Sequence, residues 1–232
     1  MVVERKISKE KYLLAALLAF LIFSFGLSLG IILDNARAKW AEKVTKEQEI
    51  NYASLQLQYL YINTLEESNQ SCSVLRIALA EAVKELSKSL DKLSQYKDDA
   101  KLNKNEFTLI GRKYTLDNLR YWLFARRTKE KCDIDIVSIL YFYSGKYCDS
   151  CPNQGTILTY FKKRFEERVL IFPIDVDLEE YEPMITILKE SYNITQYPSI
   201  IVENEKYEGV IPKEELAKLI CDSFKNKEIC LR

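Results

Sequence analysis

The chain begins with a long apolar segment. Residues 12–33 read YLLAALLAFLIFSFGLSLGIIL, which is 22 residues without a charged side chain. As a helix rising about 1.5 Å per residue, this segment would span about 33 Å, enough for a bilayer core of about 30 Å. The alternative is a cleaved signal peptide, but its apolar region would be only about 7–15 residues long. We therefore predict an uncleaved, single-pass transmembrane helix at residues 12–33, after a short basic tail at residues 1–11.

The next hundred residues show a helical pattern, with apolar side chains recurring at three- and four-residue spacings. Neither glycine nor proline occurs between residues 30 and 111, and turns usually need one of them. The pattern predicts three helices, the last with Thr115 as its N-cap, and two polar turns between them. The helices are expected at 34–68, about 72–93 and about 116–131, and the turns at 66–71 and 98–105.

We call residues 34–132 the stalk. One interpretation is a helical spacer that holds the following domain away from the membrane. The other is a coiled coil that forms a homodimer, or a surface that binds client proteins, because part of the second helix follows an a/d seam. Only about three heptads are regular, so both interpretations stay open.

The last hundred residues have a different pattern, and all five prolines of the chain lie in this part. Short β-branched and aromatic runs alternate with amphipathic segments, in the order β-α-β-α-β-β-α. This order predicts an α/β domain at residues 133–232, with a parallel strand pair, an antiparallel hairpin and helices on both faces of the sheet. The strands are expected at 135–143, 169–176, 199–202 and 206–210, and the helices at 152–167, 183–192 and after Pro212.

The amino-acid composition excludes several kinds of catalytic and binding site. The chain has 34 basic and 34 acidic side chains and no histidine. A nucleic-acid-binding protein would need a basic excess to neutralise phosphates, so we expect no nucleic-acid partner. Without histidine there is no Ser-His-Asp triad, no Cys-His pair and no HExxH zinc site. The remaining reactive groups are cysteines, carboxylates, lysines and tyrosines.

Two of the six cysteines form a CxxC motif, Cys148-Asp149-Ser150-Cys151, directly after the first strand. A zinc site would need two more ligands, and the spacing of Cys221 and Cys230 fits no zinc-ribbon pattern. We therefore expect a redox-active pair, no metal and no other cofactor. A thiol at the N-terminus of a helix is stabilised as a thiolate by unpaired backbone N–H groups and the helix dipole, and Cys148 occupies that position.

These residues resemble the thioredoxin-like family over roughly residues 136–224. The resemblance rests on the CxxC after a strand, on IDVD at 174–177 and on NITQYPSI at 193–200. It implies a three-layer α/β/α sandwich in which Cys148 is the nucleophile and Cys151 resolves the mixed disulfide. It also implies that Tyr197 and Pro198 form a cis-proline loop that faces the cysteines and binds the substrate.

The chain also departs from the family. Tyr147 replaces the frequent tryptophan before the first cysteine, and Asp149 and Ser150 replace Gly-Pro inside the motif. Asp149 would either oppose thiolate formation or cap the helix. The acidic residue that many relatives bury on the first strand is missing, and aromatic residues occupy positions 141–143. Oxidase, isomerase and reductase therefore all remain open.

The pairing of the other four cysteines predicts on which side of the membrane most of the chain lies. If the second and third helices of the stalk pack antiparallel, Cys72 and Cys132 lie at the same end and can form a disulfide. Cys221 and Cys230 would close a short loop after the last helix. The alternative is four buried free thiols. Structural disulfides persist in oxidising compartments, so two such pairs would place residues 34–232 outside the cytoplasm of a cell-membrane protein.

The predicted function is a membrane-tethered thiol–disulfide oxidoreductase that acts on protein thiols or disulfides and exchanges electrons with a redox partner protein. The alternative is a non-catalytic, membrane-anchored scaffold or adapter, whose degenerate thioredoxin-like domain binds partners and whose CxxC is a static disulfide.

Overall fold

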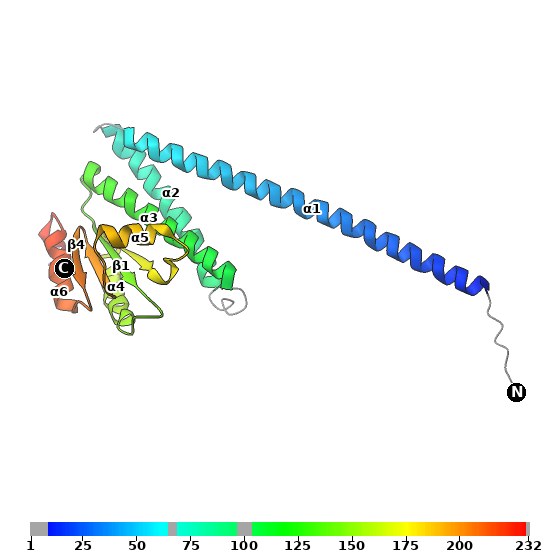
Figure 1. Ribbon diagram of the computed structural model, residues 1–232. Coiled ribbons are helices and arrows are strands. Elements are labelled where there is room, and N and C mark those ends of the chain that lie inside the picture. Colours follow the sequence, from blue (N-terminus) through cyan, green and yellow to red (C-terminus); the bar gives the residue numbers. More distant parts are fainter. Residues whose placement is uncertain (1–8, 65–68, 97–103, 231–232) are drawn as a thin grey trace. The chain divides into compact units, whose positions relative to one another are not determined.

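The computed structural model describes residues 9–64, 69–96 and 104–230, and it divides into two compact units, residues 1–64 and 65–232. The first unit is helix α1 (Lys9–Thr64), 56 residues without interruption (Figure 1). By length and composition α1 is apolar enough to cross a membrane. Residues 1–8 of the expected tail lie outside the described residues, and so do residues 65–68, which include the start of the first expected turn.

In the second unit, helices α2 (Asn69–Tyr96) and α3 (Lys104–Cys132) lie side by side (Figure 1). Helix α3 starts well before the expected position at residue 116, so Thr115 is not its N-cap. The Thr115 hydroxyl instead donates to the Gly111 carbonyl at 3.0 Å, one turn earlier in the helix. A threonine can satisfy its hydroxyl this way inside a helix, and the sequence pattern does not distinguish the two uses. Most of the second expected turn, residues 98–103, lies outside the described residues.

Four strands form one mixed sheet in the order β2-β1-β3-β4. Strand β1 pairs with β2 in parallel and with β3 antiparallel, and β3 and β4 form an antiparallel hairpin. The fold is therefore mixed α/β, as the alternating pattern predicted. The strands are β1 (Val137–Tyr143), β2 (Val169–Asp175), β3 (Ser199–Val202) and β4 (Glu205–Glu208).

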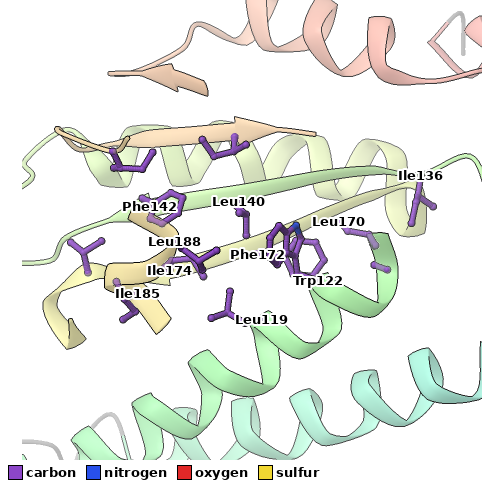
Figure 2. Packing of buried hydrophobic residues seen from close by; sticks show 14 residues of the cluster. Leu119, Trp122, Ile136, Leu140, Phe142, Leu170, Phe172, Ile174, Ile185 and Leu188 are labelled. Atoms are coloured by element: carbon purple, nitrogen blue, oxygen red, sulfur yellow. The ribbon is translucent and has the colours of Figure 1, made fainter. Parts of the chain in front are cut away.

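Successive β1 side chains enter two different hydrophobic clusters, because side chains alternate between the faces of a strand. Val137, Ile139 and Tyr141 pack with residues of helices α4 (Cys151–Phe165) and α6 (Lys213–Ser223). Leu140 and Phe142 pack with residues of α3 and α5 (Pro183–Ser191) (Figure 2). Three short 3₁₀ segments complete the unit: η1 (Glu166–Arg168), η2 (Val176–Leu178) and η3 (Lys227–Cys230).

Helix α3 packs directly on the sheet. Its Leu119, Trp122 and Ala125 are buried in the cluster that contains Leu140 and Phe172 (Figure 2). The sequence pattern predicts α3 as part of the stalk, with the next domain beginning at residue 133. In the structure, the compact unit that contains the sheet begins at residue 65, since the apolar face of α3 belongs to the core of the sheet.

Candidate functional site

The CxxC cysteines lie at the start of α4 and are joined by a disulfide, with their Cα atoms 5.5 Å apart. Cys148 is half-buried, whereas Cys151 is only 2% exposed. Pro152 occupies the first turn of α4, where a missing N–H costs no helical hydrogen bond. The two sulfur atoms thus differ in accessibility, and the more accessible one precedes the helix.

One carboxylate holds the loop that leads to Cys148. Asp177 accepts hydrogen bonds from the Ser144 hydroxyl at 2.6 Å and from the backbone N–H groups of Gly145 and Lys146 at 2.9 and 3.1 Å. The Ser144 hydroxyl oxygen in turn accepts from the N–H groups of Lys146 and Tyr147 at 3.1 and 2.9 Å. The backbone from 144 to 147 is therefore fixed from outside the loop, by a residue of η2.

Two further side chains anchor the first turns of α4. The Tyr141 hydroxyl donates to the Cys151 carbonyl at 2.6 Å, and burial raises the pKa of Tyr141 to about 12. Gln154 is fully buried, and its Oε1 accepts from the Ile211 N–H at 2.7 Å, which ties α4 to the segment before α6. The group of β1 that reaches the Cys151 backbone is therefore a neutral phenol.

An acidic side chain lies nearby, on β2 instead of β1. Asp175 is paired in register with Tyr143, and its Oδ1 accepts from the Asp177 N–H at 3.0 Å. Burial raises the pKa of the Asp175 carboxyl; the hydrogen bond from the Asp177 N–H opposes this shift, the charge of Asp177 adds to it, and Lys146 lowers the pKa. Burial also raises the pKa of Tyr143, and its ring stacks on Tyr141 with centroids 5.3 Å apart.

The expected substrate loop lies at the same edge of the sheet. The Tyr197–Pro198 peptide bond is cis, Pro198 is buried, and its carbonyl accepts from the Gly209 N–H at 2.8 Å. Ser199, the next residue, pairs with Phe142 near the end of β1. The proline therefore precedes β3 at the end of the sheet where β1 runs into the cysteine loop.

The residues that flank the cysteines are mostly exposed. Tyr147 is 82% exposed, and Asp149 is also exposed. Ser150 is the N-cap residue of α4, but its side chain makes no capping hydrogen bond; its Oγ lies 3.8 Å from the Cys148 sulfur. The N-cap position thus belongs to Ser150, and the Asp149 carboxylate is left facing solvent beside Cys148.

The structure brings the other four cysteines together in two disulfides. Cys72 of α2 is bonded to Cys132 at the end of α3, with Cα atoms 5.4 Å apart. Cys221 of α6 is bonded to Cys230 of η3, with Cα atoms 5.9 Å apart. These are the two pairs that the sequence led us to expect, and both lie away from the CxxC motif along the chain.

Sequence reasoning missed the functions of Ser144, Asp177, Gln154 and Tyr141. Asp177 belongs to the IDVD segment at 174–177, directly after a parallel strand. Polar residues at such positions cluster at the carboxyl edge of a sheet, and this was the available signal. Gln154 carried no signal, because its partner Ile211 lies 57 residues away in the sequence.

No known family model matches the sequence, and no curated protein is significantly similar to it. The chain is weakly similar to a solved structure described as that of a malarial protein, with 22% identity, a TM-score of 0.33, and coverage of 38% of this chain and 98% of the other. It is also weakly similar to chloroplastic thioredoxin z, with 19% identity, a TM-score of 0.34, and coverage of 43% and 88%. At these scores the function has to be argued from the chain's own residues.

Proposed function

We propose that this chain is a membrane-tethered thiol–disulfide oxidoreductase that acts on protein substrates through a three-layer, thioredoxin-like α/β/α domain. The observation that carries the proposal is the unequal burial of a bonded cysteine pair at the start of α4. A half-buried Cys148 can be attacked or can attack, whereas a 2% exposed Cys151 reacts best with its own neighbour. Cys148 is thus the nucleophile and Cys151 the resolving thiol.

The exchange runs through a mixed disulfide. In the oxidising direction, a substrate thiolate attacks the Cys148 sulfur, the Cys148–Cys151 bond breaks, and Cys151 leaves as a thiolate. A second substrate thiolate then attacks the substrate sulfur of the mixed disulfide, and Cys148 leaves as a thiolate. The substrate loses two electrons and gains a disulfide, while the cysteine pair gains two electrons. The reducing direction is the reverse, and a redox partner protein restores the starting state.

The membrane part of the proposal rests on α1. Its residues 12–33 would serve as a single-pass anchor in the cell membrane, and residues 34–232 would lie on the extracytoplasmic side. Support for this side comes from the Cys72–Cys132 and Cys221–Cys230 disulfides, because structural disulfides are rare in a reducing cytosol.

Two experiments test the proposal together: the trapping of mixed disulfides and the reduction of insulin. The Cys151→Ser variant should accumulate mixed disulfides with substrate proteins in its own membranes, whereas Cys148→Ser should accumulate none. The full-length protein should also reduce insulin when supplied with a dithiol, and Cys148→Ser should not. The matched control is the Cys221→Ser/Cys230→Ser pair, which removes a disulfide outside the motif and should leave insulin reduction unchanged. Insulin reduction that persists in Cys148→Ser would refute the assignment.

The second candidate is a membrane-anchored adapter whose CxxC is a static disulfide. The observation that favours it is the Tyr141 phenol at the Cys151 carbonyl. This hydroxyl donates to a backbone carbonyl, and β1 carries no carboxylate that could take the proton of the Cys151 thiol, which slows the resolving step. An adapter would show neither trapping by Cys151→Ser nor insulin reduction, so the same experiment separates the two candidates.

A further inference from the structure

A cavity of about 310 Å³ lies between helices α2 and α3 and the ends of strands β1 and β2. Much of its wall is apolar, with Leu90 and Leu93 from α2, Phe107 from α3 and Leu178 from η2. Gly111 adds to the space, since a Cβ at that position would come within 3.1 Å of a Leu178 methyl group. The cavity therefore exists because the α2–α3 pair leaves the end of the sheet incompletely filled.

Ionisable groups line another part of the wall: Asp175, Tyr143 and Tyr114. Within the described residues, the Asp175 carboxyl accepts one hydrogen bond, through Oδ1 from the Asp177 N–H. A carboxylate has about four acceptor sites, so this one retains the capacity to accept a further hydrogen bond from a guest. Burial raises the pKa values of both tyrosines, which keeps their hydroxyl groups neutral.

We propose that this cavity binds one aromatic group that carries a hydrogen-bond donor, of the phenol or indole type, with the Asp175 carboxyl as the acceptor. Ligand pockets in proteins run from about 300 to 1,000 Å³, so the volume suits a single small ring system. The leucine and phenylalanine side chains bury the ring, and the carboxyl distinguishes a ring with an O–H or N–H from a plain hydrocarbon.

The position of the cavity indicates where the ring comes from. Tyr143 is the residue immediately before the loop that leads to Cys148, and Asp175 lies two residues before Asp177, which holds that loop. An occupant therefore contacts the residue that precedes the cysteine loop and a residue next to the segment that holds this loop. We assign the ring to a tyrosine or tryptophan side chain of the protein substrate, an assignment that rests on the proposed function; the other source is a free small molecule.

Titration with free probes tests the cavity independently of redox activity. The full-length protein in detergent, with labelled leucine methyl groups, is titrated with p-cresol and with toluene. Each probe partitions into detergent to the same extent for all variants. The ratio of the apparent Kd of a variant to that of the wild type therefore reports only the change in binding to the cavity. We expect p-cresol to shift the methyl signals of Leu90, Leu93 and Leu178. Asp175→Asn should raise the apparent Kd of p-cresol about tenfold, which is the effect of losing one hydrogen bond to a carboxylate. The apparent Kd of toluene should change less than about twofold.

Leu90→Trp fills the cavity and should abolish the binding of both probes. Its matched control is Val83→Trp. Val83 lies on the same helix and is 43% exposed, against 46% for Leu90, but it does not line the cavity. This variant should bind both probes as the wild type does. The proposal is overturned if p-cresol leaves these methyl signals unmoved, if Leu90→Trp binds p-cresol normally, or if Asp175→Asn weakens both probes equally.

Peptides then identify the source of the ring. The Cys148 thiolate of Cys151→Ser attacks the peptide sulfur of a cysteine peptide activated with thionitrobenzoate, and the coloured thionitrobenzoate thiolate leaves. Among peptides with tryptophan at successive positions around the cysteine, one should react about tenfold faster than the alanine peptide, and Leu90→Trp should remove this advantage. Equal rates would overturn the substrate assignment and leave the ring to a free molecule. If no peptide reacts, the proposed function is refuted. The p-cresol titration still shows whether the cavity binds an aromatic ring.

Discussion

At the residue scale, the geometry before Cys148 depends on Asp177. Its carboxylate accepts three hydrogen bonds from the loop at residues 144–146, two of them from backbone N–H groups. The Ser144 hydroxyl extends the network to the N–H of Tyr147. Removing the carboxylate would therefore leave the backbone next to the reactive cysteine without its acceptor.

We predict that Asp177→Ala lowers the free energy of unfolding by about 2 kcal/mol, because the buried Ser144 hydroxyl and two backbone N–H groups lose a charged acceptor. Mixed-disulfide formation at Cys148 should also slow, since the loop loses its fixed geometry. Thermal unfolding and trapping in the Cys151→Ser background measure the two effects. Glu180→Ala, an exposed carboxylate three residues away, is the control and should change neither. An Asp177→Ala variant as stable as this control would contradict the prediction.

The two cysteines of the motif should also differ in reactivity. In the reduced protein we predict that Cys148 is alkylated at least about tenfold faster than Cys151 at neutral pH, because it precedes the helix and is accessible, whereas Cys151 is 2% exposed. Timed iodoacetamide labelling followed by peptide mass spectrometry measures both rates. Equal labelling rates would contradict the assigned roles, and faster labelling of Cys151 would reverse them.

Asp175 should make stability depend on pH. Burial raises its folded-state pKa against the opposing hydrogen bond from the Asp177 N–H and the opposing charge of Lys146, so the folded state binds the proton more tightly than the unfolded state. Stability from this group is full below the unfolded pKa of about 3.9 and is lost as pH rises through the raised folded pKa. Tyr143 and Tyr114, which line the same cavity, stay neutral throughout this range.

We therefore predict that Asp175→Asn removes this loss, so that the stability of the variant relative to wild type increases between pH 4 and pH 7. Thermal unfolding of both proteins across this range measures the difference. The exposed Asp222→Asn, which also removes one carboxyl group, is unfolded across the same pH range as the control. A relative stability of Asp175→Asn that falls as pH rises would mean that the ionised carboxylate is stabilising.

At the element scale, the α2–α3 pair is part of the folded unit and not a separate spacer. Buried residues of α2 such as Leu75 and Ala82 face α3, and α3 places Trp122 in the core of the sheet. The Cys72–Cys132 disulfide closes the open end of the pair. This pair also forms one wall of the cavity beside the cysteine loop.

The two structural disulfides should differ in their contribution to stability. In the chain-entropy model, closing the 60-residue separation of Cys72–Cys132 is worth about 4 kcal/mol, and the 9-residue separation of Cys221–Cys230 about 2.5 kcal/mol. We predict that replacing the first pair by serine lowers the denaturant midpoint more than replacing the second, as measured by urea unfolding. The reverse order would show that native-state packing, and not loop closure, sets their contributions.

At the scale of the whole molecule, a helix able to cross a membrane precedes a disulfide-bonded α/β unit in one chain. Residues 1–132 carry 22 basic and 16 acidic side chains, and the remainder carries 12 and 18. The basic residues that flank residues 12–33 are nearly balanced in number, so charge does not decide which way the proposed anchor would face. Orientation therefore follows from the state of the cysteines.

We predict that thiol counting on denatured, unreduced protein from native membranes finds Cys72, Cys132, Cys221 and Cys230 blocked. After reduction the same four residues should label fully, which controls for access. Deleting residues 1–33 should release the protein from the membrane fraction. Finding all four cysteines free would contradict the proposed extracytoplasmic location, and membrane retention of the deleted form would contradict the anchor.

The sequence determined those features that depend on neighbours in the chain. The apolar run at 12–33 indicates a helix long enough for a membrane, the alternating pattern after residue 133 predicts a mixed sheet, and the CxxC after a strand lies at a helix start. Helix propensity, side-chain periodicity and the N-terminal environment of a helix are local effects, acting over a few residues. They can therefore be read without knowing the fold.

Only the tertiary structure decided which distant side chains meet. Asp177 holds a loop that lies more than thirty positions earlier in the chain, Gln154 binds the N–H of Ile211, and α3 packs on the sheet instead of extending a stalk. The cavity beside the cysteine loop takes its walls from two helices and two strands. Such contacts depend on how apolar faces are buried against one another and on which buried polar groups then need partners, and no local pattern encodes either.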